Sequence, residues 1–100
     1  MNDGIIELDT NRAKEFGFTS DLFIGYLWKR ENTIFISYIE SKFPNRGNFT
    51  SLMKNIWSRG FKIAVPTPFA GMKQILMENG FKQTFEWFPE MEENCEVWIK

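Results

Sequence analysis

The amino-acid sequence predicts an α+β fold, in which a mixed, mostly antiparallel sheet contains one parallel β-α-β unit and carries helices on both faces. Segments rich in β-branched and aromatic residues alternate with segments of helical periodicity, which is typical of a sheet with helices packed on it. The chain has 100 residues, and no repeat or linker divides it. Because chains of this length rarely form two cores, we expect residues 1–100 to fold as a single domain.

The first predicted elements are a short helix over residues 10–16 and two strands. Residues 21–28 and 33–40 are rich in β-branched and aromatic side chains, and the polar segment 29–32 between them predicts a hairpin connection. Both faces of the second strand are apolar, which indicates a central strand that is covered on both sides. Strict alternation assigns Ile34, Ile36 and Tyr38 to one of its faces and Phe35 and Ile39 to the other.

A helix and a further strand follow. Apolar residues recur at helical spacing over residues 48–59, and Gly60 stands where a helix ends in a left-handed conformation. Residues 61–65 predict a short strand. The crossover from strand 33–40 through this helix predicts a right-handed connection between parallel neighbours. The buried stripe of the helix is predicted to consist of Phe49, Leu52, Met53, Ile56 and Trp57.

The C-terminal part of the chain predicts a second helix and a closing hairpin. Thr67 suits the N-cap of this helix, and Pro68 suits its first position, where a missing N–H is tolerated. Asn79-Gly80 ends the helix. Strands 81–88 and 95–99, joined by an acidic loop, predict the hairpin. The buried stripe of this second helix is predicted to be Phe69, Met72, Ile75 and Leu76.

The composition excludes several classes of protein. The chain has no histidine, which excludes Ser/His and Cys/His nucleophile pairs and nearly all zinc sites, so we expect no metal centre. The single cysteine, Cys95, is assigned to packing and fits a reducing compartment. No apolar run approaches the ~20 residues that cross a bilayer, and the N-terminus lacks the features of a signal peptide. We therefore expect a cytoplasmic protein.

The net charge of −1 hides an uneven distribution along the chain. Residues 41–77 carry six basic residues and no Asp or Glu, whereas the flanking segments hold all 13 acids. Such a segment has the electrostatics of an anion-binding surface, although solvated helix faces have the same composition. The six basic residues are Lys42, Arg46, Lys54, Arg59, Lys62 and Lys73.

The loop of residues 45–50 joins the central strand to its helix and lies inside this acid-free segment. Gly47 allows a sharp turn and a close approach of a ligand to the backbone. The N–H groups of residues 47–50 lack partners in the first helical turn and point outward. Together with Arg46 and Lys42 they suit a phosphate or pyrophosphate. The loop contains neither the Gly-Lys-Ser/Thr of a P-loop nor the three glycines of a dinucleotide fingerprint.

Taken in order, these features resemble the GCN5-related N-acetyltransferase (GNAT) superfamily. In that family a loop of the form Gln/Arg-x-x-Gly-x-Gly/Ala binds the pyrophosphate of acetyl-CoA, and Gly47 matches its first glycine. Residues 75–81 resemble the family's Leu-Tyr-Glu-x-x-Gly-Phe ending, and residues 96–100 resemble its closing strand. The resemblance covers roughly residues 21–100, with a GNAT-like cofactor-binding core at about residues 33–80. Compact proteins of this family are often encoded by phages, which would place the chain in the host cytoplasm.

Three residues depart from the family pattern. Pro44 replaces the Gln/Arg, although Arg46 could supply the charge two residues later. Phe49 replaces the second Gly/Ala, so its large side chain must turn toward the core. Leu76 replaces the tyrosine that usually protonates the departing thiolate. The first two changes concern cofactor binding, and the third concerns catalysis.

The resemblance implies an acetyl-CoA-dependent N-acetyltransferase that moves the acetyl group directly to a primary amine on a small molecule or a protein. It also implies that pantetheine lies along the edge of strand 33–40, where this strand splays from strand 61–65. A monomer or a homodimer is expected. The cofactor-binding residues implied by the resemblance are Ile39, Glu40, Asn45, Arg46, Gly47, Asn48, Phe49 and Thr50.

Two residues of the central strand are the candidates for catalysis. Glu40 is the first candidate for the general base, and an exposed carboxylate at a strand end is its structural alternative. Tyr38 is a candidate acid or pocket-lining residue, with core packing as its alternative. Tyr26 and Glu31 are weaker candidates. A backbone N–H near residues 38–40 would polarise the thioester carbonyl.

Two other classes of function stay open at this point. A GNAT-like fold without activity would serve as a binding or inhibitory module, which Leu76 and the short N-terminal segment favour. Binding of single-stranded nucleic acid would use aromatic residues and a basic surface. Most of the aromatic residues here occupy core-like positions, however, and the net charge is negative. We therefore expect neither a nucleic-acid partner nor a membrane partner.

Overall fold

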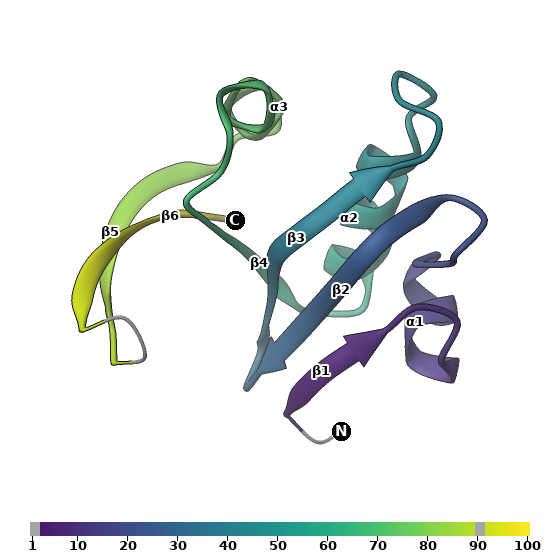
Figure 1. Ribbon diagram of the computed structural model, residues 1–100, viewed down its shortest axis with the longest axis horizontal. Helices are drawn as coiled ribbons and strands as arrows, with labels where there is room; N and C mark the ends of the chain where they lie inside the picture. The colour runs from purple at the N-terminus through teal and green to yellow at the C-terminus, as the bar shows by residue number, and fades with distance from the viewer. Residues whose placement is uncertain (1–2, 90–91) are drawn as a thin grey trace.

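The computed structural model describes residues 3–89 and 92–100, which form one six-stranded sheet and three helices. Across the sheet the strand order is β1-β2-β3-β4-β6-β5, and only β3 and β4 are parallel (Figure 1). The α+β class, the mostly antiparallel sheet and the one parallel β-α-β unit are thereby confirmed. The elements are β1 (Gly4–Glu7), α1 (Asn11–Phe16), β2 (Phe23–Arg30), β3 (Thr33–Ser41), α2 (Asn48–Ser58), β4 (Lys62–Pro66), α3 (Ala70–Glu78), β5 (Lys82–Phe88) and β6 (Glu93–Ile99).

Local chemistry explains where several elements begin and end. Thr10 caps α1, because its Oγ1 accepts a hydrogen bond from the Ala13 N–H at 3.2 Å, and Gly17 ends the helix at φ 80°. Glu31 adopts φ 54° in the tight connection between β2 and β3. The predicted stripe of α2 is confirmed at its centre, where Leu52, Met53 and Ile56 are buried. None of the helices within residues 3–89 and 92–100 is long and apolar enough to cross a membrane.

The strand β1 was not predicted from the sequence. It forms the edge of the sheet and pairs antiparallel with β2. Its two central residues are both isoleucines, but only Ile6 is buried, while Ile5 is 66% exposed. A strand of four residues is too short to show a detectable alternation.

The helix α3 begins later than predicted. It starts at Ala70, and Thr67 and Pro68 precede it instead of capping it. The Thr67 N–H donates to the Glu96 carbonyl at 2.8 Å, which holds the chain beside β6 beyond the end of β4. As a consequence Phe69 precedes the helix and is exposed, although it was predicted to be buried.

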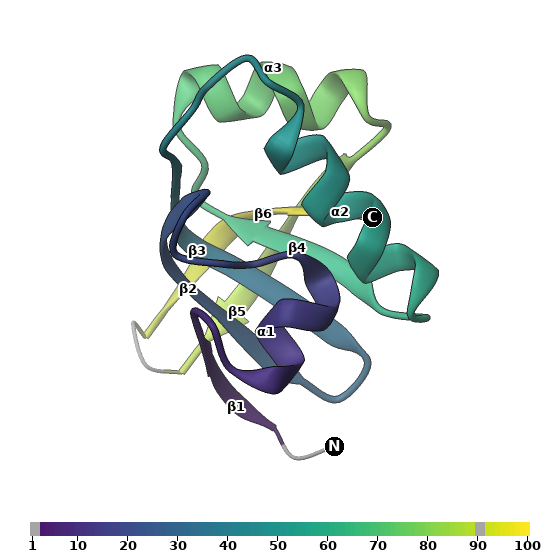
Figure 2. The ribbon, with the colours of Figure 1, turned by 90° about the vertical axis from the view of Figure 1, so that its right-hand side faces the viewer.

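All three helices contribute to one core on a single face of the sheet, which corrects the prediction of helices on both faces (Figure 2). Phe16 of α1, Ile56 of α2 and Leu76 of α3 pack there against strand residues such as Ile34 and Val65. We call this face the helix side and the opposite face the open side.

The open side is covered by the curvature of the sheet instead of by a helix. A second buried cluster lies there, and it joins Trp28 of β2 to Phe88 of β5 although three strands lie between these two. Figure 1 shows the C-terminal hairpin of β5 and β6 curving away from the plane of β1 to β3. The apolar pattern of β3 therefore predicted correctly that both of its faces are covered. It did not predict that the curved C-terminal hairpin, and not a helix, covers the open side. The buried members of the cluster are Phe35, Ala64, Phe88, Cys95 and Val97.

A β-bulge interrupts the alternation of β3. Phe35 pairs with Trp28 and Tyr38 pairs with Tyr26, so three steps along β3 match two steps along β2. Tyr38 therefore shares the open side with Phe35, while Ile39 packs against the helix-side core. The sequence prediction had placed Tyr38 with Ile34 and Ile39 with Phe35, which is wrong for both residues. Strict alternation does not account for the extra residue of a bulge.

The bulge lies where β3 separates from β4. Parallel pairing covers only residues 33–35 of β3 and 62–64 of β4, whereas β3 continues to Ser41. The edge of residues 36–41 that faces β4 is therefore left without that partner. Because a bulge increases the local twist of a strand, it turns the end of β3 away from β4. The splay expected between these two strands is present.

Candidate functional site

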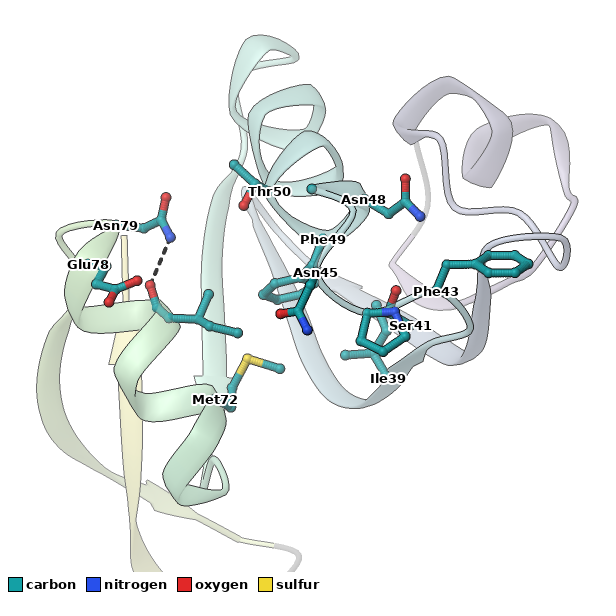
Figure 3. A pocket seen from close by; sticks show the side chains of 13 residues that line it. Ile39, Ser41, Phe43, Asn45, Asn48, Phe49, Thr50, Met72, Glu78 and Asn79 are labelled. Atoms are coloured by element: carbon teal, nitrogen blue, oxygen red, sulfur yellow. Dashed lines mark hydrogen bonds between the residues drawn. The ribbon is translucent and has the colours of Figure 1, made fainter.

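A cavity of about 370 Å³ lies on the helix side, between α3 and the loop that follows β3 (Figure 3). The end of β3, the loop, the first turn of α2 and one side of α3 form its walls. Figure 3 shows Asn45 and Phe49 facing Met72 of α3 across the cavity, while Phe43 points away from α3. The lining residues are Ile39, Ser41, Phe43, Pro44, Asn45, Gly47, Asn48, Phe49, Thr50, Met72, Ile75, Glu78 and Asn79.

The backbone of the loop leaves several amides without helical partners beside this cavity. Asn45 and Gly47 both adopt left-handed conformations, at φ 65° and 78°. The Ser51 N–H donates to the Gly47 carbonyl at 3.0 Å and begins the helix ladder, so the N–H groups of residues 48–50 have no carbonyl partner within α2. A left-handed residue followed by a right-handed one also makes adjacent N–H groups converge into an anion-binding concavity. The loop thus presents unpaired backbone donors at the N-terminus of α2.

Most of the predicted cofactor-binding residues meet at the cavity. Glu40 and Arg46 are the two that do not line it, and the Arg46 side chain is exposed in the loop. Phe49 packs against the helix-side core, as expected for a large side chain at this position. The six that line it are Ile39, Asn45, Gly47, Asn48, Phe49 and Thr50.

The candidate catalytic residues lie on the other face of the sheet. Tyr38 is directly opposite Tyr26 and Glu40 is opposite Ile24, and all four side chains are on the open side. The rings of Tyr26 and Tyr38 lie 6.5 Å apart, and Tyr38 is 45% exposed. Glu40 is also exposed. Glu31 lies in the turn at the far end of β3, which separates it from both.

Sequence reasoning missed the contribution of α3 to the cavity. Helical periodicity marked Met72 and Ile75 as apolar positions, but it carries no information about which loop they face. Glu78 brings a carboxylate to the wall, where it accepts a hydrogen bond from Gln74 Nε2 at 3.0 Å. Leu76, at the position where the resemblance to the GNAT superfamily implies a tyrosine, is fully buried in the helix-side core and does not line the cavity.

Among the residues that the structure describes, acids from the flanking segments pair with two of the six cations in the acid-free segment. Lys73 Nζ lies 3.3 Å from Glu96, and Arg59 lies 3.7 Å from Glu15. Within the described part of the chain, no ion pair involves Lys42 or Arg46. Both of these cations are exposed and place positive charge near the loop.

Comparison of the chain with protein-family models, with curated proteins and with solved structures returned no match. Among residues 3–89 and 92–100, no group of three or more Cys, Asp and Glu side chains is arranged to hold a metal ion. The geometry of the site is therefore the basis for a proposal of function.

Proposed function

We propose that this protein is an N-acetyltransferase of the GNAT type, which binds acetyl-CoA in the helix-side cavity and transfers the acetyl group to a primary amine. The splay of β3 from β4 beside the N-terminus of α2 carries the proposal. It supports the binding of an extended pantetheine chain along residues 36–41, because a strand edge offers the N–H and C=O groups that its amides need.

The loop and the first turn of α2 supply the groups that suit the pyrophosphate. The N–H groups of residues 48–50 have no partner in the helix, and Gly47 offers open space, since a Cβ there would meet nothing within 4 Å. Arg46 and Lys42 add positive charge at longer range. The Glu78 carboxylate on the α3 wall repels an anion, so the phosphates are favoured on the loop side of the cavity.

The position of Tyr38 and Glu40 supports entry of the acceptor from the open side, opposite the cofactor. There the amine nitrogen attacks the thioester carbonyl carbon, a C–N bond forms and the C–S bond breaks. Glu40 takes the proton that the amine loses, and Tyr38 donates a proton to the departing thiolate. A backbone N–H near residues 38–40 stabilises the charge on the carbonyl oxygen. Tyr38 thus acts as the general acid, a role that the apolar side chain of Leu76 cannot take.

A second candidate function is that of a GNAT-like binding or inhibitory module without turnover. The complete burial of Leu76 favours it, because the family's usual acid is replaced by a core residue. Production of CoA from acetyl-CoA in the presence of any amine excludes this candidate.

Thermal unfolding with and without acetyl-CoA tests the proposed function. A ligand at ~100 times its dissociation constant adds ~2.7 kcal/mol, which raises the midpoint of a domain of this size by roughly 10 °C or more. No shift with either acetyl-CoA or CoA would contradict both the activity and the site. A shift with CoA but no turnover with a panel of amines would support the binding module instead.

A further inference from the structure

A second cavity, of about 380 Å³, lies on the open side where β3 and β4 separate. Its walls are largely apolar. Trp28 and Phe35 line the cavity with ring centroids 5.1 Å apart, and Phe88 of the curved β5 lines it as well. Phe35 and Phe88 belong to the buried cluster of this face, so these walls are held by packing. The cavity is thus a preformed apolar recess.

Two residues that carry hydroxyl groups line this cavity, Ser37 of β3 and Thr67, which follows β4. None of the described residues that line it carries a charge. Burial of an unpaired charge in apolar surroundings is costly, so the recess favours the uncharged part of a ligand. A cationic head would remain at its mouth, near hydroxyl groups and the exposed end of β3.

Thr67 adds an independent sign of function. It adopts φ 41°, a left-handed conformation that β-branched residues rarely take, and it stands between Pro66 and Pro68. The hydrogen bond from its N–H to the Glu96 carbonyl holds it there. Strained residues that persist because their surroundings hold them cluster at binding and catalytic sites. Here the strained residue lines the recess itself.

The two cavities flank the same stretch of β3. Ser37 lines the open-side cavity and Ile39, two residues later, lines the helix-side cavity. Both residues belong to the segment of β3 that has separated from β4. A ligand in the open-side cavity therefore lies against the strand edge along which the thioester is proposed to lie.

We propose that the open-side cavity binds the apolar part of the acceptor, and that the acceptors are primary amines carrying an aromatic or branched aliphatic group. This inference rests on the proposed function for the identity of the reacting amine. It excludes polyamines and other acceptors that are charged along their whole length, because the recess offers no carboxylate to them.

Titration of the ¹⁵N-labelled protein with 2-phenylethylamine, followed by amide chemical shifts, tests this inference. We expect saturable shifts of the amides of Ser37, Thr67 and Cys95, and no comparable shifts with 1,4-diaminobutane. No saturable shift with 2-phenylethylamine, shifts centred elsewhere, or equal effects of the two amines would overturn the proposal.

A pair of variants locates the binding. Ser37→Phe fills the recess from an exposed strand position and is expected to abolish the shifts. Thr84→Phe places the same side chain on β5, at a residue that does not line the cavity, and is expected to leave them. Retention of binding in Ser37→Phe overturns the proposal, and the titration of the wild-type chain remains decisive if that variant does not fold.

A parallel titration with acetyl-CoA separates this inference from the proposed function. Shifts of the amides of residues 47–50 with acetyl-CoA, but none with 2-phenylethylamine, leave the proposed function intact and overturn the acceptor class. Binding of 2-phenylethylamine without any response to acetyl-CoA contradicts the proposed function and with it the role of the recess as an acceptor site. Binding of both, with acetylation of 2-phenylethylamine at least 10-fold faster than that of 1,4-diaminobutane, supports the two together.

Discussion

Gly25 of β2 lies directly against the backbone of Tyr38 on β3, so that a Cβ atom at position 25 would stand 2.2 Å from the Tyr38 carbonyl oxygen. The contact is next to the bulge of β3, which lies between the Tyr26–Tyr38 pair and the Trp28–Phe35 pair. Glycine in a strand often marks such a close approach of two backbones. The course of β3 at the proposed thioester site therefore depends on the absence of a side chain on its neighbour.

The first prediction concerns this contact. Gly25→Ala is expected to reduce the free energy of unfolding by about 2–5 kcal/mol, because it adds a steric clash to an unfavourable backbone conformation at φ 127°. Urea unfolding measures the loss. Gly4→Ala is the matched control, since Gly4 has a similar φ of 136° but open space around it. Its expected cost is about 1 kcal/mol, which comes from the backbone conformation alone. Equal losses in the two variants would show that the Tyr38 contact contributes nothing.

The second prediction concerns the loop at the start of α2. Gly47→Ala is expected to remove most of the thermal shift produced by acetyl-CoA, because alanine resists φ 78° and disturbs the convergence of the loop amides. Gly60→Ala at the other end of α2 is the matched control, with φ 87° and open space. Both variants are expected to lose about 1 kcal/mol of stability, but only the first to lose the response to the ligand.

Arg46→Ala refines this comparison. Arg46 does not line the cavity, so its removal is expected to weaken the acetyl-CoA shift less than Gly47→Ala does, and the difference from the wild-type chain is expected to shrink as salt is added. A complete loss of the shift in Arg46→Ala would mean that the guanidinium, and not the backbone, carries the pyrophosphate.

The third prediction concerns Leu76, at the position where the resemblance to the GNAT superfamily implies a tyrosine. Leu76→Tyr is expected to lower stability by about 1–3 kcal/mol without raising any activity, because the side chain is fully buried in the helix-side core. The neighbouring Ile75→Tyr is the control, since Ile75 lines the cavity and is 37% exposed. Its expected change lies within about 0.5 kcal/mol. Higher turnover in Leu76→Tyr at unchanged stability would refute the assignment of this position to the core.

The fourth prediction concerns the dependence of stability on acid. The Trp98 indole N–H, 2.8 Å away, is the main cause that lowers the pKa of Glu96 below its usual 4.5. Partial burial opposes this effect, and hydrogen bonds from Gln83 Nε2 at 2.7 Å and from Lys73 reinforce it. Hydrogen bonds also lower the pKa values of Asp3, bonded by Lys29, and of Asp9, bonded by Ser20.

The direction of the pH effect follows from these shifts. Because the pKa of Glu96 is lower in the folded chain, the unfolded chain binds more protons as the pH falls toward and below 4.5. The contribution of Glu96 to stability is therefore complete above its unfolded pKa of 4.5 and is lost as the pH falls through its lower folded pKa. We expect a steady unfolding midpoint down to about pH 5.5 and a steep fall below about pH 4.5. Glu96→Gln is expected to flatten part of that fall in urea unfolding curves. Glu86→Gln on β5 is the control, and an identical acid profile in both variants would remove Glu96 from the explanation.

Much of the fold could be predicted because its elements depend on local chemistry. The strands and helices other than β1 and the start of α3 lie within two residues of their predicted bounds, since capping residues, turn residues and apolar periodicity act over a few neighbours. The loop of residues 45–50 could be identified for the same reason. Its amides and its glycine are local properties of a strand-to-helix junction.

The arrangement of these elements depended on contacts that no local pattern contains. The bulge in β3 lies beside the close approach of Gly25 to Tyr38, and it moved Tyr38 and Ile39 to the faces opposite those predicted. The curvature of β5 and β6, which brings Phe88 to Trp28, replaced the expected second layer of helices with an apolar recess.

The sequence by itself thus determined the α+β class, the parallel unit and an acid-free loop suited to an anion, because each is set by residues close together in the chain. Only the tertiary structure decided that α3 closes the helix-side cavity, that Tyr38 and Glu40 face the open side, and that a second cavity lies there. The physical reason is that register, twist and curvature follow from pairing between strands far apart in sequence, where one inserted residue exchanges the two faces.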